Sequence, residues 1–74
     1  MKVNQALSLV LSERRRQLGR SIREAERISG VSRSTLSLLE SGKRGCTIEL
    51  LYRLVSGYSL TPRGLLGRVE QKTR

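Results

Sequence analysis

The sequence predicts a small all-α domain, a bundle of five short helices. Apolar residues recur along it at three- and four-residue spacing, which is the period of a helix with one buried face. No run of alternating apolar and polar residues predicts a strand. Good N-cap residues and helix-ending glycines separate the helical segments. We expect the 74 residues to form a single domain, 1–74, without a linker or repeat.

The first helix is predicted between Asn4, a good N-cap residue, and Gly19, a good residue to follow a helix end. One face of this helix carries Leu7, Val10, Leu11, Arg14, Arg15 and Leu18. The start Met1-Lys2-Val3 resembles a signal peptide superficially. Polar residues interrupt the apolar stretch after it, so we assign this segment to the first helix.

The second and third helices are predicted on either side of a short turn. Ser21-Ile-Arg-Glu24 is a capping-box pattern that opens the second helix, which ends near Ser29. Gly30-Val31 makes the turn, because glycine tolerates a positive φ. Ser32 caps the third helix, which runs from Arg33 to about Ser41 with Leu36 and Leu39 facing inward. Gly42 stops it, and a basic loop over residues 43–46 follows.

Thr47 is predicted to cap the fourth helix, and Gly57 to end it. Its apolar face is expected to comprise Ile48, Leu51, Leu54 and Val55, with Leu50 and Tyr52 alongside. Thr61-Pro62 is an N-cap followed by proline at the first helical position, and it starts the fifth helix. Leu65, Leu66 and Val69 supply the apolar side of that helix, and residues 70–74 are expected to be a frayed tail.

Composition indicates a polyanionic partner. The chain has 15 Lys and Arg against 6 Glu and no Asp, a formal net charge of +9. Such a balance suits nucleic acid first, and an acidic membrane or acidic protein second. The hydrophobic fraction of 36% is enough for a modest core, so we expect a folded chain.

Enzymatic chemistry is poorly supported. The chain has no His and one Cys, Cys46, so it lacks the residues of a Ser-His-Asp site or a typical zinc site. Gly42-Lys43-Arg44 lacks the other residues of a phosphate-binding loop. We expect no enzyme activity, no metal and no cofactor. A single Cys fits a reducing compartment, and no apolar run exceeds three residues, so we expect a cytoplasmic protein without a membrane span.

The two helices around Gly30 match a helix-turn-helix at residues 21–41. A helix fits the major groove of B-DNA, where its N-terminal side chains reach base edges. The stretch from Ser21 to Arg44 resembles the lambda-repressor/Cro-type (XRE-type) family, and the resemblance extends from about Leu7 to Leu66. Its landmarks are Arg15, Leu18-Gly19, Ser21, Gly30-Val31-Ser32, Leu36, Leu39-Glu40 and Gly42-Lys43. The resemblance implies a compact five-helix, lambda-repressor-like DNA-binding domain, usually a dimeric transcriptional regulator.

Two residues depart from the family pattern. Glu26 stands where relatives have a small residue, usually Ala, and a carboxylate there must be paired or bend outward. Arg27 and Arg33 are the candidate partners. Ile22 stands where relatives often have a Gln that touches DNA, so that contact is expected to be absent.

The resemblance also implies individual contacts. Base readers are expected at Arg33, Ser34, Ser37 and Leu38; Leu38 is either a thymine-methyl contact or an extension of the core. Phosphate contacts are expected at Ser21, Arg23, Thr35, Lys43, Arg44 and Thr47. Arg14, Arg16, Arg20, Arg23 and Arg27 form a basic group of which some members meet phosphate and others are only solvated. Arg15 and Glu40 match a structural salt bridge of the family, and a dimer interface is expected at Leu60, Leu65, Leu66 and Val69.

We therefore expect a sequence-specific, double-stranded DNA-binding regulator of a prokaryote or phage, acting as a homodimeric repressor on a palindromic operator. We expect no small-molecule ligand domain, because 74 residues suffice for one small domain, and we expect control through dimerisation or a protein partner. Two alternatives remain open. One is an antitoxin or controller-type regulator that acts mainly with a protein partner. The other is a nonspecific polyanion binder, whose affinity would fall with salt equally on all sequences.

Overall fold

The computed structural model describes residues 1–74 and confirms the all-α fold predicted from the sequence. It has five α-helices and one short 3₁₀ helix, and no strand. In chain order these are α1 (Val3–Gln17), α2 (Ile22–Ser29), α3 (Arg33–Glu40), α4 (Ile48–Leu54), η1 (Val55–Tyr58) and α5 (Pro62–Thr73). None of these helices is both long and apolar enough to cross a membrane.

Side-chain caps set the starts of four helices, as the sequence indicates. Ser32, Thr47 and Thr61 each accept a hydrogen bond from the backbone N–H three residues on, and Ser21 does so within a complete capping box. The prediction for α1 is wrong by two residues. This helix begins after Lys2 without a side-chain cap, and Asn4 lies inside it, with its side chain against Gly45.

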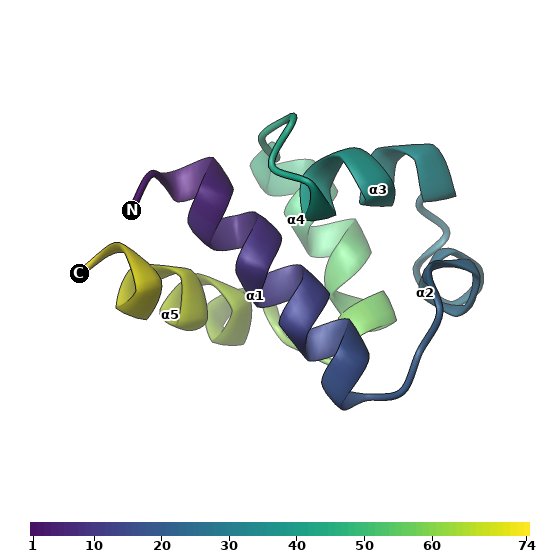
Figure 1. Cartoon of the computed structure of the whole chain (residues 1–74). Coiled ribbons are helices and arrows are strands. Elements are labelled where there is room, and N and C mark those ends of the chain that lie inside the picture. The colour runs from purple at the N-terminus through teal and green to yellow at the C-terminus, as the bar shows by residue number, and fades with distance from the viewer.

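Helix α1 is the central element of the fold. It packs against α3 on one side and α5 on the other, while α2 packs on both α3 and η1 (Figure 1). Fourteen buried apolar residues form one continuous core, in which Leu11, Leu36, Leu39 and Leu65 are fully buried. These four leucines come from α1, α3 and α5, so the core ties the third helix directly to the centre of the molecule.

Helix α5 differs from the prediction in two respects. It continues to Thr73 instead of fraying at residue 70, and Lys72 Nζ lies 3.1 Å from Glu13 Oε1 of α1. Leu65 is fully buried and Val69 nearly so, because this face of α5 packs on α1. Both side chains are thus buried within the single chain, and the dimer interface expected at these residues stays a prediction. Leu66 remains half-exposed, and Leu60 packs partly against the core.

The predicted apolar face of α4 is also wrong in part. Leu51, Leu54 and Val55 are buried as expected, but Ile48 is 64% exposed. Ile48 is the first residue of the helix and Tyr52, 65% exposed, follows it one turn later. Both therefore lie on the side of α4 that faces away from the core.

Candidate nucleic-acid interface

Helix α3 presents a polar face to solvent. Its inward residues Leu36 and Leu39 are fully buried. The four residues expected to read bases are all exposed, and helical geometry places them on the opposite side: Arg33, Ser34, Ser37 and Leu38. A helix anchored by two buried leucines can therefore offer these four side chains to a ligand without rearrangement.

Leu38 belongs to this outward face. Its side chain is 42% exposed, which argues against the alternative interpretation of Leu38 as an extension of the core. A leucine on a polar face can pack against an apolar group of a ligand, and the thymine C5-methyl is such a group in the major groove.

The turn between α2 and α3 positions the third helix. Gly30 has φ +76°, a left-handed conformation that side chains with a Cβ rarely adopt. The next residue, Val31, is buried in the core, and its backbone N–H donates to Ser29 Oγ at 3.1 Å. Ala25 of α2 is fully buried, and α2 packs directly on α3. The turn thus holds α2 and α3 in a set relative orientation.

Glu26, the unusual carboxylate of α2, is paired with Arg33. Its Oε2 accepts the backbone N–H of Arg33 at 3.0 Å, and its Oε1 lies 3.2 Å from Arg33 Nε. The carboxylate is thereby satisfied at the start of α3, where the helix dipole also favours negative charge. Of the two partners considered from the sequence, it is Arg33 that fills the role.

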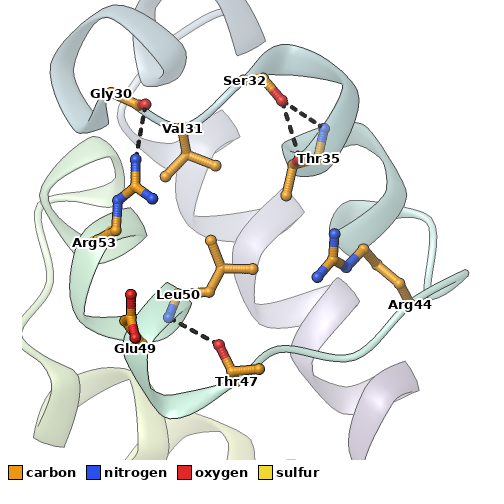
Figure 2. A pocket seen from close by; sticks show the side chains of 9 residues that line it. All are labelled: Gly30, Val31, Ser32, Thr35, Arg44, Thr47, Glu49, Leu50 and Arg53. Carbon is orange, nitrogen blue, oxygen red and sulfur yellow. Dashed lines mark hydrogen bonds between the residues drawn. The ribbon is translucent and has the colours of Figure 1, made fainter.

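Three residues expected to contact phosphate line one open groove between α3 and α4. Thr35 comes from α3, Arg44 from the loop that follows, and Thr47 from the start of α4 (Figure 2). The groove has a volume of about 550 Å³, and Arg53 and Glu49 close its other side. Arg53 is tied to the turn by a 3.4 Å hydrogen bond from Nη2 to the carbonyl of Gly30. The groove is lined mainly by polar side chains and carries two guanidinium groups, so it suits an anion.

The remaining phosphate candidates lie at two other helix ends. Lys43 is exposed directly after α3. Ser21 caps α2, but its own backbone N–H donates to Glu24 Oε1 at 3.0 Å. These hydrogen bonds lower the pKa of Glu24 and keep a carboxylate at this helix start. An anion that approaches this helix start would meet that negative charge, and Arg23, the residue before Glu24, is exposed.

Cys46 does not contribute reactive chemistry to the groove. Its side chain is partly buried, and Sγ lies 3.2 Å from the carbonyl oxygen of Thr47, which accepts the thiol proton. Burial raises the pKa of this thiol, so the nucleophilic thiolate is disfavoured.

Comparison with known proteins identifies the family. A model of helix-turn-helix domains matches residues 11–65, about three quarters of the chain. The chain belongs to the helix-turn-helix family. The crystal structure of the clp gene regulator ClgR from C. glutamicum is similar over 100% of this chain and 96% of that chain, with a TM-score of 0.86 and 26% sequence identity. No curated protein sequence matches the chain.

The helix-turn-helix consists of α2, the turn at Gly30 and α3. Membership of this family makes the protein a DNA-binding transcriptional regulator. In such motifs the second helix enters the major groove and the first crosses the backbone. The outward face of α3 and the groove beside it are therefore the surfaces on which DNA recognition is to be sought.

An ion pair anchors the recognition helix of the helix-turn-helix to α1. Arg15 Nε lies 2.9 Å from Glu40 Oε2, and Arg15 Nη2 donates to Glu40 Oε1 at 2.9 Å. The Glu40 side chain is only 7% exposed. Hydrogen bonding to Glu40 raises the pKa of the Arg15 guanidinium. Tyr58 is the second partner of Glu40, with its hydroxyl donating to Glu40 Oε2 at 2.6 Å.

Two arginines of the expected basic group have structural roles instead. Arg14 donates from Nε to the carbonyl of Tyr58 at 3.0 Å and from Nη2 to that of Ser59 at 3.1 Å. Arg20 donates from Nη1 to the carbonyl of Gly57 at 2.9 Å. These carbonyls lie at the end of η1, where the helix leaves them without intrahelical partners. Arg14 and Arg20 thus tie the end of η1 to α1 and to the connection between α1 and α2.

Proposed function

We propose that this protein is a dimeric repressor that reads a palindromic operator with α3 in the major groove. The observation that carries the proposal is the outward face of α3, where Arg33, Ser34, Ser37 and Leu38 are all exposed on a rigidly anchored helix. In this proposal Arg33 pairs with a guanine, the two serines meet base edges or phosphate, and Leu38 packs on a thymine methyl.

Phosphate binding in the proposal comes mainly from the basic side of the motif. Four residues in α3 or following it in sequence would contact the phosphates of the adjacent DNA strand: Thr35, Lys43, Arg44 and Thr47. Arg23, and more weakly Ser21, would contact the backbone at the start of α2. The net charge of +9 supports this sequence-independent attraction.

A dimer is supported by exposed apolar surface. Half-sites one helical turn apart are separated by ~34 Å, a spacing that calls for two copies of a domain whose longest extent is 32 Å. Of the four residues expected at the dimer interface, Leu66 on α5 is half-exposed and Leu60 is partly buried against the core. A dimer bound to an operator excludes other proteins from that duplex, and for this reason we propose repression in a prokaryotic or phage setting. The regulator ClgR, similar in structure, is described as acting on clp genes.

The proposal is tested by selecting bound duplexes from a randomised pool at near-physiological salt and sequencing them. We expect a palindromic consensus whose half-sites lie about one turn apart, and lower transcription from a template that carries it when the protein is added. A pool without any enriched motif would instead indicate a charge-driven binder. Enrichment of a single half-site would support sequence-specific binding but contradict the proposed dimer.

A further inference from the structure

The contact between Glu26 and Arg33 engages both carboxylate oxygens with one residue. Oε2 accepts the backbone N–H of Arg33, and Oε1 pairs with the side-chain Nε. The distances are 3.0 Å and 3.2 Å, and the two side chains are 37% and 49% exposed. The carboxylate therefore holds both the main chain and the guanidinium of the first residue of α3.

The pairing at Nε has a consequence for the rest of the guanidinium. Arginine carries five N–H donors in a fixed planar fork, and four of these are on the two η nitrogens. Bidentate recognition of guanine uses two parallel N–H groups, directed at O6 and N7. A carboxylate that pairs with Nε restrains the flexible side chain and leaves the four N–H groups of the η nitrogens to a ligand.

We propose that Glu26 is a positioning residue that holds Arg33 ready to read guanine and so determines base preference at one operator position. This inference rests on the proposed function, in which Arg33 contacts a base. The carboxylate also repels nearby phosphate, so its presence lowers affinity for all duplexes while raising the preference for the right one. An arginine without such a partner would serve phosphate and several bases about equally.

A role in folding alone makes a different prediction. An ion pair exposed to this extent is screened by solvent and contributes little to stability. The orientation of α2 and α3 rests on the buried residues Ala25, Val31 and Leu36 instead. Replacement of Glu26 should thus leave the domain folded, and its effect should appear in base preference and not in helical content.

The test is a double-mutant cycle read out as base preference. Wild type, Glu26→Gln, Arg33→Ala and the double variant are titrated with the selected operator, with operators in which each guanine is replaced singly, and with random duplex. We expect Glu26→Gln to reduce the preference for one guanine about tenfold, within the range that a bidentate pair supplies. Its affinity for random duplex should stay equal or rise. In the Arg33→Ala background, Glu26→Gln should leave base preference unchanged.

Two further variants complete the experiment. Glu26→Asp keeps the charge on a shorter side chain and should restore part of the preference. Glu70→Gln removes a carboxylate on α5, where Glu70 is exposed, and should leave preference unchanged. Circular dichroism verifies that each variant is folded.

The possible outcomes distinguish a failure of the positioning role of Glu26 from a failure of the proposed function. If Glu26→Gln leaves every guanine preference intact while Arg33→Ala abolishes one, the positioning role is overturned and Arg33 remains a reader. An equal loss on all duplexes would also overturn it, in favour of a purely structural contact. If Arg33→Ala changes no preference, or selection yields no motif, the proposed function fails at this residue and the inference falls with it.

Discussion

Tyr58 donates its hydroxyl to Glu40 across a distance of 2.6 Å, which joins η1 to the end of the recognition helix. Tyr58 is fully buried, and burial followed by the bond to Glu40 raises its pKa. Arg15 approaches the same carboxylate from α1. Three separate elements thus meet on one buried carboxylate, and α3 is held at its C-terminal end by polar contacts as well as by leucines.

Removal of the Tyr58 hydroxyl should weaken this junction. We expect Tyr58→Phe to lower the free energy of unfolding by about 1.5–3 kcal/mol, the usual contribution of a hydrogen bond to a charged group. Urea denaturation measures the change. Tyr52→Phe is the matched control, because Tyr52 is 65% exposed and should change stability by less than about 0.5 kcal/mol. Equal effects of the two substitutions would contradict the assigned role.

Two glycines should respond to alanine in opposite directions. A Cβ on Gly57 would lie 2.7 Å from the carbonyl oxygen of Ala25, where η1 meets α2. We expect Gly57→Ala to destabilise the domain by about 1–3 kcal/mol, because the backbones of η1 and α2 must move apart to accommodate the added Cβ. Gly67 lies within α5 with open space around it, so Gly67→Ala should stabilise by about 0.5–1 kcal/mol. Thermal unfolding of both variants tests the sign, and a stable Gly57→Ala protein would argue against this close approach.

The basic loop after α3 should account for part of the salt dependence of DNA binding. Replacing Lys43 and Arg44 with Ala should reduce affinity on every duplex and lower the slope of log K against log salt by up to about two units. Arg63→Ala with Arg74→Ala removes the same charge from exposed positions at the two ends of α5 and should change the slope much less. Anisotropy titrations at several salt concentrations give the slopes. Identical slopes for the two double variants would place the phosphate contacts elsewhere.

Leu66 offers the test of the dimer. Its side chain is 49% exposed, so Leu66→Glu should not disturb the fold. In a dimer interface the new charge would be buried unpaired, and we expect the dimer dissociation constant to rise on the order of 100-fold. Sedimentation equilibrium measures it. Ile48→Glu on α4 is the companion variant, since Ile48 is 64% exposed. Dissociation by that substitution alone would move the interface from α5 to α4.

Much of the fold could be predicted because helix ends are local. Ser21, Ser32, Thr47 and Thr61 satisfy amides within their own first turn, so a few neighbouring residues decide where those helices start. Apolar spacing likewise identified Leu36 and Leu39 as the inward side of α3. The outward side followed by helical geometry, whereas the choice of base readers on it came from the family resemblance.

Other features depended on where distant segments meet. Periodicity marked Leu65, Leu66 and Val69 as one apolar side of α5, but it could not tell which of them would face α1 and which would face solvent. The sequence placed Arg14 and Arg20 in a basic group but could not show that they donate hydrogen bonds to carbonyls of η1. No sequence signal connected Tyr58 to Glu40, because a hydrogen bond between residues so far apart in sequence exists only after the helices have packed.

The sequence by itself determined the four capped helix starts, the turn at Gly30 and the polar face of α3, since each depends on residues within about one helical turn of one another. Tertiary structure alone decided which charges are free to meet DNA. Arg14, Arg15 and Arg20 donate hydrogen bonds within the fold, whereas Arg33 pairs with Glu26 and remains 49% exposed. Lys43 and Arg44 stay exposed beside the recognition helix. Electrostatic partners are selected by distance in space, and only the packed fold sets those distances.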